Sequence, residues 1–285
     1  MVEEKTNPEL ERLQKYLKRE KISPLEAITA IHSSKKQQIK QPRLNISGKS
    51  FQYMYLSDTH IGHKSFKENM FDKFVRVAKK EKPDFVLHPG DHLEGMSGRP
   101  GHIYELTHLG FENQIKYAEE LYNQIPVPIY GIDGNHDEWY EKKGNGGVIV
   151  GKNLERRVNN YHNLGQGEGT IDVNGIKIYL YHGADGTAYA DSYKLQKLVE
   201  SFTSGDKPNI IHSGHYHKAL SSFTRNVYGF ESGTLMGQSR WMRGKKIRAH
   251  IGFGLVKVNY NSKGVDSLTH TFYPGFEERE KPLKI

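Results

Sequence analysis

Apolar runs and amphipathic segments alternate along the chain from residue 51. Three apolar runs of strand length, 51–56, 84–87 and 127–132, are separated by segments 66–80 and 112–124, whose apolar residues recur at three- and four-residue spacing. The runs predict buried strands and the spaced segments predict helices. This βαβαβ order implies parallel strands joined by helical crossovers.

The second half of the chain is richer in predicted strands. The runs 170–173 and 176–181 flank Asn174-Gly175, a pair typical of a two-residue hairpin turn. The glycine-rich segment 142–151 lacks the nucleotide-binding glycine patterns, so we interpret it as a mobile loop. The remaining apolar patterns predict short helices at 154–158 and 192–202, and strands at 209–211, 227–230, 253–260 and 267–273.

Two short helices are predicted ahead of this alternating region. They cover residues 7–20 and 23–31, and each has a proline near its start. A helical hairpin that packs on a neighbour is a commoner use of such a pair than DNA reading. Residues 35–43 are rich in lysine and glutamine and resemble a linker. We therefore predict a helical extension and basic linker over residues 1–48 and a main domain over residues 49–285.

Composition narrows the possible functions. The chain has 285 residues, no cysteine and a net charge of +8. The absence of cysteine excludes disulfides, thiolate metal sites and cysteine nucleophiles, so any metal must bind to His, Asp, Glu or Asn. The charge favours a polyanionic partner, although a generally basic surface would give the same value. There is no apolar stretch of membrane-spanning length and no apolar signal region, so we expect a cytoplasmic protein without membrane contact.

Five predicted strands end in residues of the types that bind metals. Open α/β sheets keep their sites at the carboxyl ends of strands, so these side chains are expected to converge. The strand-end residues are Asp58, His60, Asp91, His92, Asn135, His136, Asp137, His182, His215 and His217.

This series of motifs resembles the calcineurin-like metallophosphoesterases over residues 51–273. The resemblance implies a four-layer αββα sandwich, with two mixed sheets between helices, and a dinuclear metal centre at the strand ends. By resemblance, one metal would be held by Asp58, His60, Asp91 and His217. The other would be held by Asp91, Asn135, His182 and His215, with Asp91 bridging the two.

The chemistry of such a centre suits phosphoester hydrolysis. Two ions roughly 3.5–4 Å apart can stabilise both the attacking and the leaving oxygen, and metal-bound water loses its proton near neutral pH to become the attacking hydroxide. By resemblance, His136 would act as general acid and Asp137 would orient its ring, with Asp58 completing the catalytic set. Mixed nitrogen and oxygen ligands favour Mn²⁺, with Fe and Zn²⁺ as alternatives.

The substrate is indicated by two features. The family's protein phosphatases have arginine within the second motif, whereas this chain has Asp91-His92-Leu93, which favours the phosphodiesterases and nucleases. His92 is a candidate phosphate contact, with a structural role in the loop as the alternative. The cationic segment 233–248 also resembles, at its start, the small exonuclease subunit of archaeal replicative DNA polymerase.

Arginine, lysine and tryptophan in that segment suit single-stranded nucleic acid, because cations neutralise phosphates and aromatic faces stack on bases. The candidate contacts are Arg240, Trp241, Arg243 and Lys245. The alternative is a solvated basic loop with Trp241 packed on the core.

The predicted function is a dinuclear-metal phosphodiesterase, foremost a nuclease that acts on single strands or exposed ends. One alternative is a phosphodiesterase or phosphomonoesterase of small nucleotides, including cyclic ones. Another is a non-catalytic replication or repair subunit that retains the fold.

Overall fold

The computed structural model describes residues 15–19, 23, 41–142, 147–186, 188–203 and 205–276. The chain divides into two compact units, residues 1–39 and 40–285. In the smaller unit, residues 15–19 are helical, within the helix predicted over 7–20. The rest of that helix and the one predicted over 23–31 lie outside the described residues, apart from Ser23, which is in neither helix nor strand.

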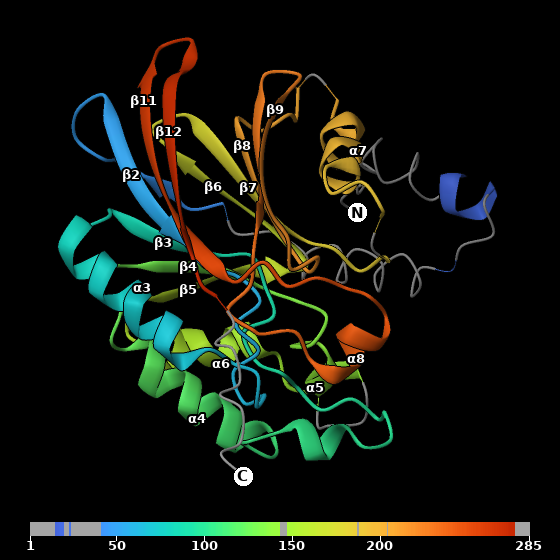
Figure 1. Ribbon diagram of the computed structural model, residues 1–285. Helices are drawn as coiled ribbons and strands as arrows, with labels where there is room; N and C mark the ends of the chain where they lie inside the picture. The colour runs from blue at the N-terminus through green and yellow to red at the C-terminus, as the bar shows by residue number, and fades with distance from the viewer. Residues whose placement is uncertain are drawn as a thin grey trace, which may run out of the picture. The chain divides into compact units, whose positions relative to one another are not determined.

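Two mixed six-stranded sheets form the centre of the larger unit (Figure 1). Sheet 1 has the order β12 (Gly264–Pro274), β11 (Gly252–Asn261), β2 (Ser50–Tyr55), β3 (Phe85–His88), β4 (Ile129–Asp133) and β5 (Tyr161–Gln166). Sheet 2 has the order β1 (Arg43–Leu44), β6 (Glu168–Val173), β7 (Ile176–His182), β8 (Ile210–Gly214), β10 (Val227–Ser232) and β9 (Ala219–Thr224).

Helices cover the outer face of each sheet, which gives the predicted αββα layering (Figure 1). Sheet 1 packs against α3 (Glu68–Glu81), α4 (Phe111–Tyr122) and α6 (Val150–Arg157), and sheet 2 packs against α7 (Tyr193–Ser201). The shorter helices are η1 (His102–Glu105), α5 (Trp139–Lys142) and α8 (Arg240–Gly244). Among the described helices, none has the length and apolar content that crossing a bilayer requires.

The alternation of side chains along β2 explains why it carries apolar residues on both of its faces. Phe51, Tyr53 and Tyr55 face sheet 2 in the core between the sheets, whereas Met54 faces the helices. Successive side chains of a strand point to opposite faces, so a strand covered on both sides needs apolar residues on each face.

Strands β2, β3, β4 and β5 are mutually parallel, as the βαβαβ pattern predicted for the first three. Strands β7, β8 and β10 are parallel in sheet 2. The predicted hairpin joins β6 to β7, and both Asn174 and Gly175 have positive φ, as a type I′ turn requires.

Three segments differ from their predictions. Residues 41–48 fall within the predicted N-terminal extension and linker, 1–48, but lie in the larger unit, where β1 pairs with β6. The glycine-rich segment 142–151 runs into α6, which begins at Val150, four residues earlier than predicted. The cationic segment contains a short helix, α8, whose Ser239 Oγ accepts a hydrogen bond from the Met242 amide.

Candidate metal centre

Five strand ends meet at one edge of the two sheets. Strands β2, β3 and β4 contribute from sheet 1, and β7 and β8 contribute from sheet 2. The aspartate and histidine candidates form three groups, and within each group one ligand atom of every residue lies within 4.8 Å of the others. The groups are Asp58–His60–His217, His60–Asp91–His136 and Asp91–His182–His215, and they include the candidate acid His136. Asn135 joins them through Oδ1, which lies 3.0 Å from His182 Nε2 and 2.8 Å from His215 Nδ1.

Asp91 lies between the two halves of the site. Its Oδ2 is 3.6 Å from His60 Nε2 and 3.3 Å from His182 Nε2. On the His60 side, His217 Nε2 lies 3.0 Å from His60 Nε2 and 3.4 Å from Asp58 Oδ1. One carboxylate oxygen thus faces histidines from both sheets, which is the arrangement that a bridging ligand needs.

Outer hydrogen bonds leave one nitrogen of each of three candidate histidine ligands facing the centre, whereas Nδ1 of the fourth, His217, is buried without a hydrogen-bond partner among the described residues. His60 Nδ1 is 2.8 Å from Glu94 Oε2, His182 Nδ1 is 2.8 Å from the carbonyl of Pro89, and His215 Nε2 is 3.0 Å from the carbonyl of Asp185. When these nitrogens donate, the opposite nitrogen of each ring presents a lone pair inward. Protein metal sites orient their histidines in this way, so the residues fit a pair of divalent cations.

The backbone at these positions is strained. Asp58, His60, Asp91, His215 and His217 all have positive φ, between 47° and 76°. Non-glycine residues seldom adopt this conformation, which costs on the order of 1–3 kcal/mol each and clusters at functional sites. The strain turns each side chain from the end of its strand towards the common centre.

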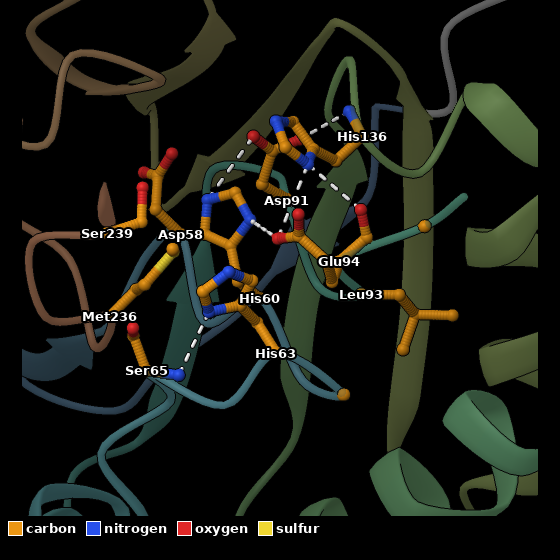
Figure 2. A network of polar contacts seen from close by, with 12 residues as sticks. Asp58, His60, His63, Ser65, Asp91, Leu93, Glu94, His136, Met236 and Ser239 are labelled. Atoms are coloured by element: carbon orange, nitrogen blue, oxygen red, sulfur yellow. Dashed lines mark hydrogen bonds and ion pairs between the residues drawn. The ribbon is translucent and has the colours of Figure 1, made fainter. Parts of the chain in front are cut away.

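Glu94 is a site residue that the sequence reasoning missed. Its carboxylate is buried and lies 2.8 Å from His60 Nδ1 and 3.5 Å from His136 Nδ1 (Figure 2). It also lies 2.7 Å from His102 Nε2. The Glu94 carbonyl also accepts a hydrogen bond from His136 Nδ1 at 2.9 Å. Glu94 therefore joins a candidate ligand to the candidate acid. Its place within the second motif, three residues after Asp91, was the available signal.

Contrary to the prediction, Asp137 does not contact the His136 ring. Its carboxylate accepts hydrogen bonds from the backbone amides of His92, Leu93 and Gly134, at 2.8–3.1 Å. The turn at residues 134–137 directs Asp137 back to the loop after β3, so it fixes that loop and leaves the orientation of His136 to Glu94.

His92 is also corrected from a candidate phosphate contact to a buried structural residue. Its Nδ1 is 2.9 Å from the Tyr122 hydroxyl, and its Nε2 is 2.8 Å from the Tyr161 hydroxyl and 3.0 Å from the Ile132 carbonyl. With both ring nitrogens engaged inside the protein and no exposed surface, His92 cannot reach a substrate.

The electrostatics favour positive charge at His136 and His182, whereas burial lowers the pKa values of His60 and His215. Burial opposes ionisation of Asp91, but His182 and His136 outweigh it and hold the pKa of Asp91 well below its usual range. Burial likewise disfavours charged His136 and His182, yet nearby carboxylates, Asp91 foremost, raise their pKa values to about 9 and about 10. A place that stabilises imidazolium so strongly also suits metal cations.

A cavity of about 700 Å³ opens over the candidate ligands. Trp241 and Lys245 line it, and Arg240 lines an adjoining cavity together with both of them. Trp241 is 47% exposed, so it is not packed in the core. Arg243 lines neither cavity. Arg99 and Trp139 also line the main cavity and were not singled out from the sequence.

Comparison with known proteins agrees with this geometry. Residues 51–252 match the model of the calcineurin-like phosphoesterase family. The DNA polymerase II small subunit of Archaeoglobus fulgidus is 23% identical over 244 residues, which cover 68% of this chain and 48% of that protein. The DNA double-strand break repair protein Mre11 of Methanococcus maripaludis is 26% identical over 206 residues, which cover 59% of this chain and 52% of that protein.

The chain therefore spans about half the length of these curated relatives. A solved archaeal phosphodiesterase covers 78% of this chain and 99% of its own, with 13% identity and a TM-score of 0.46. The matched segment runs from β2 to the start of β11 and includes every strand end that meets at the candidate centre. The protein is thus a member of the calcineurin-like phosphoesterase family, as its motifs predicted.

Proposed function

We propose that the protein hydrolyses phosphodiester bonds in unpaired or end-exposed nucleic acid, using two divalent cations, with Mn²⁺ as the preferred ion. The observation that carries this proposal is the position of Asp91, whose Oδ2 lies 3.6 Å from His60 Nε2 and 3.3 Å from His182 Nε2. Asp58, His60, Asp91 and His217 would hold one ion. Asp91, Asn135, His182 and His215 would hold the other.

When bound, the two ions would supply positive charge to the substrate phosphate and acidify a water for attack at phosphorus. His136 is the proposed acid for the leaving oxygen. Its Nδ1 donates to the Glu94 carbonyl at 2.9 Å, which leaves Nε2 for the substrate. The His136 amide also donates to Asp91 Oδ1 at 2.8 Å, so the acid and the bridging carboxylate keep a fixed spacing.

Nucleic acid is favoured by the residues around the cavity. Trp241 offers an exposed aromatic face and Lys245 a cation beside the candidate ligands, the combination by which proteins hold unpaired strands. The named relatives, a DNA polymerase subunit and a DNA repair protein, support the same class of partner. The cytoplasmic location stays a prediction from the sequence.

Hydrolysis of small nucleotides is the second candidate. The cavity volume of about 700 Å³ favours it, because small-molecule sites typically measure roughly 300–1,000 Å³. A non-catalytic subunit is less well supported, since binding alone gives no physical reason for a full set of oriented ligands beside His136.

The test uses metal-stripped protein, with and without added Mn²⁺. The substrates are bis-p-nitrophenyl phosphate, p-nitrophenyl phosphate and an end-labelled single-stranded oligonucleotide. We expect metal-dependent cleavage of the diester and the oligonucleotide. Activity on small substrates alone would favour the nucleotide enzyme, and the absence of any activity in protein shown to contain both ions would contradict hydrolysis.

A further inference from the structure

The loop after β3 and helix α8 meet at the mouth of the cavity. Arg99 comes from that loop and Glu105 ends η1, whereas Trp241 comes from α8 and Lys245 directly follows it. All four line both the main and the adjoining cavity. None of the four is a candidate metal ligand. In Figure 2, Met236 and Ser239, which precede α8, lie across His60 from His136.

Arg99 is held at this mouth by two contacts that a substrate could replace. Its guanidinium forms an ion pair with Glu105, and its Cζ lies 5.7 Å from the centroid of the Trp241 ring. The Arg99 side chain remains 37% exposed. A carboxylate and a phosphate bind to the same N–H groups of an arginine, so Glu105 occupies the guanidinium to which a phosphate would bind.

We propose that Arg99 and Trp241 form a nucleotide subsite beside the metal centre, in which an unpaired base stacks on Trp241 and a flanking phosphate displaces Glu105 from Arg99. This inference rests on the proposed function and extends it by naming the selective groups. A paired base has both faces covered by its neighbours in the duplex, so only an unpaired or splayed base can present a face to Trp241. The subsite thus selects single strands and frayed ends.

Arg99 also accounts for a departure from the family pattern. The second motif lacks the arginine that grips phosphate in the protein phosphatases, because His92 and Leu93 follow Asp91. Arg99 comes from farther along the same loop and reaches the same cavity as Asp91. Its pairing with Trp241 couples phosphate binding to base stacking, which a phosphoprotein substrate could not use.

The first test measures binding to Trp241 in metal-stripped protein. The chain has two tryptophans, so Trp139→Phe leaves Trp241 as the only indole reporter. The probes are a short oligothymidylate and the same oligomer with abasic sites. Stacking is worth roughly 1–3 kcal/mol per base, so the base-bearing oligomer should bind roughly 5- to 150-fold more tightly and quench the fluorescence.

Variants distinguish stacking from general attraction. Trp241→Ala should remove the preference for the base-bearing oligomer, measured by anisotropy of a labelled oligomer, whereas Trp241→Phe should keep part of it. Phe223→Ala is the matched control, because Phe223 is an exposed aromatic on the edge strand β9 that lines neither cavity. Equal affinities for the two oligomers in the unsubstituted protein would overturn the stacking role of Trp241.

A double-mutant cycle tests the exchange of partners at Arg99. Glu105→Gln removes the competing anion and should raise oligomer affinity several-fold, and Arg99→Gln should lower it. In the Arg99→Gln background, Glu105→Gln should have a much smaller effect, because its partner is gone. The same gain in both backgrounds would mean that Glu105 acts only as a general negative charge, and the exchange would be refuted.

These measurements separate the subsite from hydrolysis, because they need no turnover. A protein that prefers the base-bearing oligomer but cleaves nothing would refute the proposed function and retain the subsite. A protein that cleaves oligonucleotides but binds abasic and base-bearing oligomers equally would refute the subsite and retain the proposed function.

Discussion

Asp91 connects the two halves of the candidate centre, so its substitution should affect both ions. Asp91→Ala removes the oxygen shared by His60 and His182, and His217→Ala removes a ligand from one half only. We expect both variants to lose activity, and Asp91→Ala to lose more metal. Metal content by mass spectrometry and the rate on bis-p-nitrophenyl phosphate provide the check, with Phe223→Ala as the control. Undiminished activity in both variants would refute the ligand assignment.

His136 should matter to turnover and little to metal binding. General acid catalysis is typically worth ~10²–10⁴-fold, and it matters most when the leaving oxygen is a poor leaving group. His136→Ala should therefore retain both ions, lose activity on an oligonucleotide by that order, and lose less on a p-nitrophenyl ester. An unchanged rate on the oligonucleotide would remove His136 from the mechanism.

The individual site residues differ in how far they could be predicted. Asp58, Asp91 and His217 follow apolar runs. Because sites of α/β sheets lie at the carboxyl ends of strands, their positions were enough to predict that they lie together. Glu94 and Arg99 lie on one loop whose path depends on tertiary contacts, such as the bond from the Gly95 amide to Gln114 of α4. Asp137 was expected to act on its neighbour in sequence, but the turn directs its carboxylate elsewhere.

At the scale of elements, the strand-end loops require close packing of backbone against ligands. A Cβ on Gly134 would lie 2.2 Å from Asp91 Oδ1 and 2.7 Å from His182 Cε1. Gly134→Ala must therefore displace the loop or the Asp91 carboxylate.

We expect Gly134→Ala to lower metal affinity by roughly 10- to 100-fold, the range seen when the groups that support metal ligands are disturbed. Isothermal titration with Mn²⁺ measures this change. Gly205→Ala is the matched control, since a Cβ there meets nothing within 4 Å. Equal affinities in the two variants would contradict the close packing.

The interface between the sheets should make the protein sensitive to acid. His212 of β8 is fully buried, 2.9 Å from the Tyr53 hydroxyl and 3.3 Å from Ser232 Oγ. Burial, with a smaller contribution from His270, holds the pKa of His212 well below its usual value. The unfolded chain therefore binds a proton below about pH 6.5 that the folded chain does not. For this group, the free energy of unfolding falls by about 1.4 kcal/mol for each unit by which the pH is lowered below that value.

The double variant Tyr53→Phe/His212→Phe should show a smaller loss of stability on acidification. It removes the titrating ring and also the hydroxyl that would otherwise lose its partner. Urea unfolding of metal-stripped protein at pH 7 and pH 5 measures the difference, while other buried histidines contribute equally to both proteins. The same loss in the two proteins would mean that His212 is not the group responsible.

Strands with apolar or alternating sequences could be predicted, and those with other patterns could not. Strand β5 contains His162, Asn163 and Gly165, and its place in the sheet depends on pairing with β4. Strand β9 forms the edge of sheet 2 and is half polar without regular alternation, so pairing with β10 defines it. Helix α8 has five residues, too few for a periodic pattern.

At the scale of the whole molecule, the division of strands between the sheets could not be derived from periodicity. Strand β11 pairs with β2, although most of the sequence separates them, and β10 pairs with β8 although β9 lies between them in the chain. The four-layer arrangement was expected only because the motifs resembled a family. The motifs imply the four-layer arrangement because the side chains that they supply follow strands of two sheets, whose strand ends must meet at one edge.

Metal binding should stabilise the whole fold, because the candidate ligands come from both sheets. Asp58, His60, Asp91 and Asn135 follow strands of sheet 1, whereas His182, His215 and His217 end or follow strands of sheet 2. Unfolding separates the sheets and destroys the centre, so cations bind the folded state alone. Each ion at a hundredfold excess over its Kd would then add roughly 2.7 kcal/mol to the free energy of unfolding.

Thermal unfolding of metal-stripped protein, repeated with increasing Mn²⁺, measures this linkage. We expect Tm to rise by several degrees for each ion, since roughly 1 kcal/mol shifts Tm by 2–4 °C in a domain of this size class. Asp91→Ala should abolish most of the rise, and Phe223→Ala should leave it intact. A stoichiometric metal content without any rise in Tm would mean that the ions bind the unfolded chain equally well, which a centre built from two separate sheets does not allow.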